Sequence, residues 1–201
     1  MRTPPQSTSD WPTLVATAAV PEISARLADG NDVDAADTVG RSAILIAAKA
    51  GRLDVVRQLI AEGADIDAQD QVRLNPLLWG CLSNNIELVE IMLEAGADVT
   101  RTTRFDGVPI HPAAEKGHLE IVRLLCGTDV NVNHTNICGW TPMLEAVLLG
   151  DGGSRQQEIV RLLLAAGADP SMTDQWGVSP LAHAQRLGFV ELAELLTAAA
   201  E

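Results

Sequence analysis

Features that would point to several common functional classes are missing from this 201-residue sequence. It contains 14 Lys and Arg residues and 27 Asp and Glu residues, which gives a formal net charge of −13. Such a chain would repel a phosphate backbone or an anionic lipid surface at long range. We therefore expect neither nucleic acid nor a membrane among its partners.

Paired cysteines and long hydrophobic runs are missing as well. Cys81, Cys126 and Cys138 form no CxxC pair, and an odd number of cysteines at these spacings suits reduced thiols better than disulfides. No stretch approaches the roughly 20 apolar residues of a transmembrane helix. The short run LVATAAV ends near Pro21 and fits the repeat described below, so we do not interpret it as a signal peptide. These features predict a cytoplasmic location.

Motifs for catalysis are also absent. No glycine-rich phosphate loop precedes a helix, no nucleophile elbow is present, and no two histidines stand four residues apart as in a zinc protease. The run NVNHTN at 131–136 has carboxamides but no carboxylates, which makes it a poor calcium loop. We predict no enzymatic activity, no cofactor and no metal. A bound metal or small molecule would revive the enzymatic alternative.

What the sequence does contain is an internal repeat. Matching positions are spaced by 33, 33, 33 and 38 residues, at Ala43, Pro76, Pro109, Pro142 and Pro180. Four residues after each of these anchors stands a small residue, namely Ala47, Gly80, Ala113, Ala146 and Ala184. Eight residues after each anchor stands Gly or Asn, which tolerate the left-handed conformation that closes a helix: Gly51, Asn84, Gly117, Gly150 and Gly188.

A second helix follows each of these turns. The segments LDVVRQLI, IELVEIML, LEIVRLLC, EIVRLLL and VELAELL carry apolar residues at helical spacing. A polar loop such as EGADIDAQD comes next. Because no single unit can bury its own apolar stripe, the units must stack on one another.

We predict one all-α domain over residues 10–201, an α-solenoid of about six repeats with degenerate N- and C-terminal caps, behind a disordered tail at 1–9. We expect it to be monomeric. The predicted units are 10–36, 37–69, 70–102, 103–135, 136–173 and 174–201.

These units resemble a known family. The segments VPIHPAAEKGHLEIVRLL, GWTPMLEAV and EIVRLLLAAGADP are similar to ankyrin repeats, and the whole chain resembles small stand-alone bacterial ankyrin-repeat proteins. The resemblance implies that the first helix of each unit lines a concave groove and that the loop before it forms a projecting finger. It also implies that His111 and His118 are structural. Pro112 predicts an irregular helix start, and Thr141 predicts a helix cap.

The same resemblance implies that the protein binds another protein through its groove and fingers. Ile46, Trp79 and Leu82 would form an apolar patch on the groove. Apolar residues recur at the fingers as Val39, Val72, Phe105, Cys138 and Trp176, and exposed apolar area bordered by charge is typical of interaction sites. The candidate partner-binding residues are Ile46, Trp79, Leu82, Arg73, Arg101, Arg104, Phe105, Glu115, Trp140, Glu145 and Trp176.

Alternatives remain open at this stage. The finger residues could pack on one another and stiffen the row instead of meeting a partner. The insertion GDGGSRQQ at 150–157 lengthens one inter-helix turn by five residues, as a neutral change or as a protruding partner contact. The acidic first loops could make the protein an inhibitor or nucleic-acid mimic that binds a basic enzyme; their aspartates are Asp29, Asp32, Asp34, Asp37, Asp65, Asp67 and Asp70.

Overall fold

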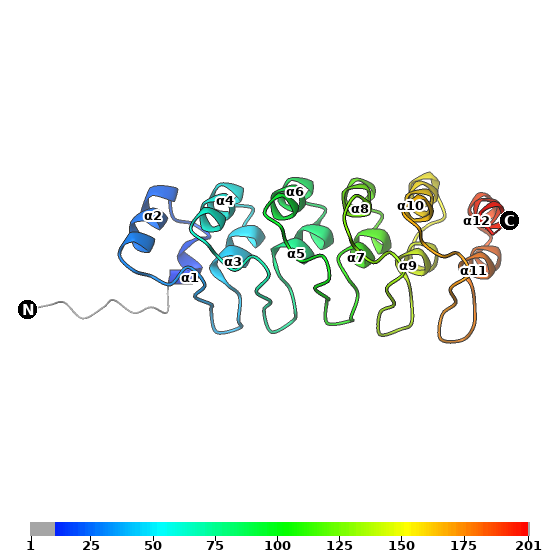
Figure 1. The fold of residues 1–201 in the computed structure, drawn as a ribbon, viewed down its shortest axis with the longest axis horizontal. Helices are drawn as coiled ribbons and strands as arrows, with labels where there is room; N and C mark the ends of the chain where they lie inside the picture. Colours follow the sequence, from blue (N-terminus) through cyan, green and yellow to red (C-terminus); the bar gives the residue numbers. More distant parts are fainter. Residues whose placement is uncertain (1–10, 201) are drawn as a thin grey trace, which may run out of the picture. The chain divides into compact units, whose positions relative to one another are not determined.

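The computed structural model describes residues 11–200 and is built from pairs of short helices joined by loops (Figure 1). The tail expected at 1–9 lies outside the described residues. The helices are α1 Trp11–Leu14, α2 Val20–Ala28, α3 Ala43–Lys49, α4 Leu53–Ala61, α5 Pro76–Ser83, α6 Ile86–Glu94, α7 Ile110–Glu115, α8 Leu119–Cys126, α9 Pro142–Leu149, α10 Ser154–Ala165, α11 Pro180–Leu187 and α12 Val190–Ala199. Within 11–200 the one β-type pairing is an isolated antiparallel bridge between Ala36 and Ser42.

The described residues fall into two compact units. The first contains the residues up to Gly80 together with Glu87–Ala97, and the second contains Cys81–Ile86 together with the residues from Asp98 onward. In the first unit α1 packs on α3, and α2 packs on α4. The expected single domain and its repeat boundaries stay predictions.

Two layers of helices build the second unit. Helices α7, α9 and α11 pack in one layer, α8, α10 and α12 pack in the other, and the loops before α9 and α11 project from the first layer (Figure 1). Fully buried side chains such as Ile110, Ile121, Leu125 and Met143 fill the core of this unit. The amphipathic second helices therefore bury their stripes by stacking, as their spacing predicts.

The column of small residues is buried at every repeat. A Cβ atom on Gly80 would lie 2.8 Å from Cγ2 of Val89 and 3.5 Å from the Leu88 side chain. The glycine of the α5 segment thus makes room for α6, which confirms that its role is in packing.

Left-handed residues close the first helix of most repeats. Gly51, Asn84, Gly117 and Gly188 all have positive φ, between 56° and 75°. The same expectation was wrong for Gly150, whose φ and ψ are −85° and 178°. The insertion that follows carries the chain onward in an extended conformation, and Gly152 adopts the positive φ instead, at 70°.

Helix caps follow the repeat with one exception. The side chain of Thr141 accepts a hydrogen bond from the backbone N–H of Leu144, which confirms the predicted cap. Ser42, Asn75 and Ser179 accept equivalent bonds. In the third full repeat α7 begins only at Ile110 and has six residues, without a side-chain cap. The irregular start that Pro112 predicts is therefore present.

Candidate partner-binding surfaces

Four of the five finger loops are closed by a polar side chain at the base that accepts two backbone N–H groups. In the finger of Phe105, the Thr103 hydroxyl accepts the N–H of Phe105 at 3.3 Å. The Asp70 carboxylate accepts hydrogen bonds from the N–H groups of Val72 and Leu74, at 3.0 and 2.9 Å. In three other fingers the backbone N–H groups two and four residues further along the chain donate in the same way, to the side chains of Asp37, Asn136 and Asp174. At the residue after the tip the backbone turns to positive φ, at Gly40, Arg73, Asp106, Gly139 and Gly177. This local bonding fixes the shape of the loop and turns its tip outward.

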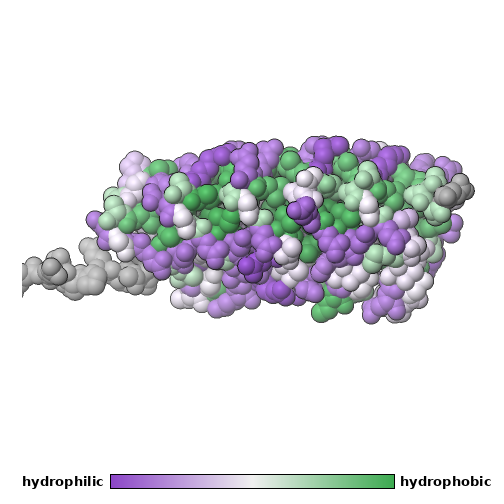
Figure 2. Space-filling model, in the orientation of Figure 1, coloured by the Kyte–Doolittle hydropathy of each residue, from purple (hydrophilic) through white to green (hydrophobic). Residues whose placement is uncertain are grey.

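The finger tips are largely exposed and apolar. Phe105 is 55% exposed and Trp176 is 69% exposed, whereas Val39 and Val72 are exposed by just under half. Cys138 is half-buried, but its neighbour Ile137 is 69% exposed. On the face shown in Figure 2, hydrophobic residues gather over the helices, and the loops at the lower edge are mostly hydrophilic. An exposed apolar tip on a finger therefore stands out from its surroundings.

Adjacent fingers are held together through their backbones. In the first unit the N–H of Gln71 donates to the carbonyl of Val39 at 3.2 Å, and in the second unit Ile137 donates to Phe105 at 2.9 Å. Each bond links the main chains of two neighbouring fingers, whereas the alternative supposed packing between their side chains. The bonds leave the tip side chains exposed, so stiffening and recognition do not compete.

The expected groove patch is only partly present. Ile46 is 8% exposed, because α3 is covered by α1 and α4 and its residues from Ala43 to Ala48 are all buried. The expectation that Ile46 lines an open surface was wrong. Trp79 in the first unit is half-buried, and Lys49 Nζ lies 4.9 Å from its ring centroid. Leu82, in the second unit, is also half-buried.

Glu145 is a core residue rather than a surface carboxylate. It is 7% exposed, so it cannot pair with a partner's cation as expected. The Asn136 side chain donates to Glu145 Oε1 at 2.6 Å, and Oε2 has no hydrogen-bond partner among the described residues. Burial, together with the nearby Glu115 carboxylate, raises the pKa of Glu145 to about 7. In the next repeat, the residues equivalent to Asn136 and Glu145 are Asp174 and His183. Nε2 of His183 lies 2.8 Å from Oδ2 of Asp174.

Trp140 belongs to the base of its finger. It is half-buried, and its indole N–H is enclosed without a hydrogen-bond partner among the described residues. Its carbonyl oxygen lies 3.1 Å from Nε2 of His111, which is 1% exposed. His118 likewise contacts the Cys81 carbonyl oxygen through Nδ1 at 2.8 Å. Both histidines are therefore structural, as the family resemblance implied.

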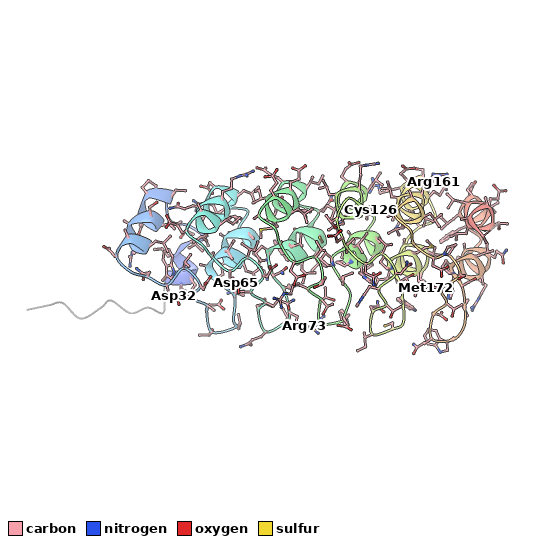
Figure 3. The ribbon with its side chains drawn as sticks, viewed as in Figure 1. Asp32, Asp65, Arg73, Cys126, Arg161 and Met172 are labelled. Atoms are coloured by element: carbon pink, nitrogen blue, oxygen red, sulfur yellow. The ribbon has the colours of Figure 1, made fainter. Side chains whose placement is uncertain are left out.

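The predicted charged residues differ in their surroundings. In the second unit Arg104 lies 4.7 Å from the ring centroid of Phe105, and Arg101 pairs with Asp98 at 3.2 Å. Glu115 is half-buried and pairs with Lys116 at 3.3 Å. Arg73 is exposed on a finger of the first unit (Figure 3). Arg104 is thus the cation that sits directly beside an exposed aromatic tip.

The acidic first loops have a structural use for their carboxylates. Asp32 and Asp65, in successive return loops of the first unit (Figure 3), each accept the N–H two residues ahead at 3.0 Å. Asp34 accepts the N–H of Asp65 at 2.7 Å and so joins the two loops. In the second unit Asn133 makes the equivalent bond to Asp169. The carboxylates of Asp32, Asp34 and Asp65 thus take part in local bonding of the return loops.

The sequence reasoning missed one feature and misjudged another. The first is Ile137: the equivalent residues Thr38, Gln71, Arg104 and Gln175 are polar, so an isoleucine there was a usable signal. The second is the insertion, which is largely absorbed into helix. Helix α10 has 12 residues against eight in α8, and Gly152 packs against the Phe189 ring. The turn is therefore not lengthened by five residues.

No helix within residues 11–200 is both long enough and apolar enough to cross a membrane. All three cysteines are free thiols.

Comparison with known proteins gives consistent matches. The model of the family of ankyrin repeats, built for three copies, matches residues 15–103 and 105–174. YahD of Escherichia coli K12, named as an ankyrin repeat protein, is 57% identical over 76 residues, which is 38% of each chain. The match therefore spans well under half of that relative.

Solved structures match over nearly the full length. An ankyrin repeat domain from Acinetobacter baumannii AYE has a TM-score of 0.92 at 38% identity, covering 96% of this chain and 99% of that one. The ankyrin repeat protein EF0377 has a TM-score of 0.89 at 29% identity, covering 96% and 98%. With the repeating helix pairs, closed fingers and structural histidines described above, these matches show that the chain belongs to the ankyrin-repeat family.

Proposed function

We propose that this protein binds another protein through the finger loops of its second unit. Ankyrin repeats are generally protein–protein interaction modules, and proteins of the family are typically non-enzymatic scaffolds. The observation that carries the proposal is the set of exposed apolar tips Phe105, Ile137 and Trp176. Side chains at the base of these loops accept hydrogen bonds from the loop backbone, one in the finger of Phe105 and two in each of the others. Side chains of this kind on rigid loops lose little conformational freedom on binding.

The chemistry of the fingers suits a partner with an apolar segment next to acidic side chains. Arg104 stacks near the Phe105 ring, and aromatic residues with arginine are the commonest energetic anchors of interfaces. Cys138 and Trp140 are half-buried at the finger base and would support the tips rather than enter the partner. Trp79 and Arg73 extend the proposal to the first unit as a separate patch.

Replacement of Phe105, Ile137 and Trp176 by alanine is expected to abolish capture of the partner from an extract of the source cells. Each such side chain contributes about 2 kcal/mol or more to binding at a hot spot. Loss of all three should therefore weaken the affinity by more than a thousandfold. Capture is measured by quantitative mass spectrometry against the unmodified protein.

The matched control replaces exposed apolar residues away from the fingers, Leu187→Ala with Val190→Ala, and should capture the same partners as the unmodified protein. Recovery of every partner by the finger variant, with an unchanged urea unfolding curve, would refute the proposal. Binding that collapses between low and moderate salt would instead favour the acidic-inhibitor alternative.

A further inference from the structure

The insertion at 150–157 borders a pocket in the second unit. The pocket has a volume of about 540 Å³. Its walls come from the end of α7 with the following turn, and from the loop and first turn that open α10. It lies at the inter-helix turns, and its lining includes none of the finger-tip residues.

Gln156 is a buried polar residue in the wall of this pocket. It is 3% exposed, and in the part of the chain that the structure describes its side-chain amide makes no hydrogen bond. Two glycines leave room for the amide: an added Cβ would lie 3.0 Å from its Oε1 at Gly117 and 2.5 Å from its Nε2 at Gly150. The amide atoms are not wholly enclosed, so their hydrogen-bonding capacity is open to a group in the pocket.

Two further sets of donors border the same pocket. Arg155 lines it and makes no ion pair within residues 11–200. The N-cap of α10, Gly153, offers no side chain to the N–H groups of the first turn. A helix N-terminus with unsatisfied N–H groups favours negative charge. The available groups are thus a guanidinium, an amide and backbone N–H donors.

The acidic residues in the lining set the charge of the ligand. Asp151 accepts the N–H of Gly153 at 2.9 Å, and Glu115 pairs with Lys116 at 3.3 Å. Both are therefore occupied, and both would repel a dianion such as phosphate. We propose that the pocket binds a singly charged carboxylate group, held by Arg155, the Gln156 amide and the first-turn N–H groups of α10.

The carboxylate could be a small free acid or the C-terminus of a peptide, and NMR titration of the ¹⁵N-labelled protein separates these sources. The probes are acetate, tetra-alanine with a free C-terminus, its C-terminal amide, and inorganic phosphate, at constant ionic strength. We expect saturable shifts of the Gln156 side-chain amide and of the backbone N–H signals of Ser154 and Arg155, which open α10 and line the pocket. A peptide acid that binds more tightly than acetate assigns the site to a C-terminus, and the reverse order assigns it to a free acid.

Three results would overturn the inference: no saturable shift with either carboxylate, tighter binding of phosphate than of acetate, or equal shifts with the peptide amide and the peptide acid. None of these results bears on the finger loops, so the two proposals can fail separately.

Variants test the named donors. Gln156→Met keeps the buried volume and removes the amide, and Arg155→Ala removes the guanidinium. Each is expected to weaken binding of the better carboxylate about tenfold, the usual effect of losing one charge-assisted hydrogen bond. Arg161→Ala is the matched control, because Arg161 lies on the same helix and pairs with Glu158 instead (Figure 3). An equal loss in all three variants would contradict the assignment.

Discussion

Replacement of Glu145 by Gln is expected to raise the free energy of unfolding at pH 8 by about 3 kcal/mol. Burial and the Glu115 carboxylate raise the pKa of Glu145 from 4.5 to about 7 in the folded protein. Each pKa unit corresponds to about 1.4 kcal/mol. The protonated form is therefore favoured on folding, and ionisation at high pH opposes folding. The uncharged amide of the Glu145→Gln variant would keep the hydrogen bond from Asn136.

The pH dependence of stability follows from the same difference between the ordinary pKa of Glu145 and its pKa in the folded protein. The stabilising effect of proton uptake is complete below about pH 4.5 and is lost as the pH rises to about 7. The wild type and Glu145→Gln should therefore have similar stabilities at pH 4 and diverge up to about pH 7. Urea unfolding followed by circular dichroism across this range measures both curves.

An exposed glutamate provides the control for Glu145. Glu194 on α12 is exposed, and Glu194→Gln should change stability by no more than about 0.5 kcal/mol at any pH in this range. Parallel curves for the wild type and Glu145→Gln between pH 4 and 8 would show that the Glu145 carboxyl is not buried as described.

Gly152→Ala is expected to lower the free energy of unfolding by about 2–5 kcal/mol. Gly152 is buried with a φ of 70°, and an added Cβ would lie 2.4 Å from atoms of the Phe189 ring. The left-handed conformation costs an alanine about 1–2 kcal/mol, and overpacking adds about 1–3 kcal/mol. The ring has to move, which disturbs the contact between the insertion and the turn before α12.

Gly167→Ala isolates the backbone part of that effect. Gly167 has a φ of 91°, but an added Cβ there would meet no atom within 4 Å. Its loss should be about 1–2 kcal/mol, smaller than that of Gly152→Ala. Equal losses in the two variants, measured by urea unfolding, would mean that the insertion does not pack on Phe189.

The repeat pattern was sufficient to predict the fold, because helix periodicity and turn chemistry are local. The 33-residue spacing predicted a small packing residue at Ala47, Gly80 and Ala113, each of which is buried, and left-handed turns at Gly51 and Gly117. Apolar finger tips at Phe105 and Trp176 followed from the same register, and both are exposed. Whether these tips bind a partner stays a prediction.

Whether the side chain at a given repeat position is buried or exposed was harder to predict, because it depends on the neighbouring side chains. Ile46 and Glu145 occupy equivalent positions and were both expected on an open surface, yet both are buried. Their burial depends on how closely adjacent helices approach, and the register does not encode that distance. The insertion was misjudged for a related reason: in GDGGSRQQ, which appears to form a loop throughout, the last four residues belong to helix α10.

The self-contained bonding of the fingers has a consequence for diversification of the family. Asp37, Asp70, Asn136 and Asp174 hold their loops through main-chain N–H groups, so the side chain at the tip takes no part in closing the loop. Under the proposed function, substitutions at the tips would therefore change what the protein recognises while leaving the framework intact. New specificities can then accumulate one finger at a time, and a library randomised at the tip residues should yield folded proteins with altered binding.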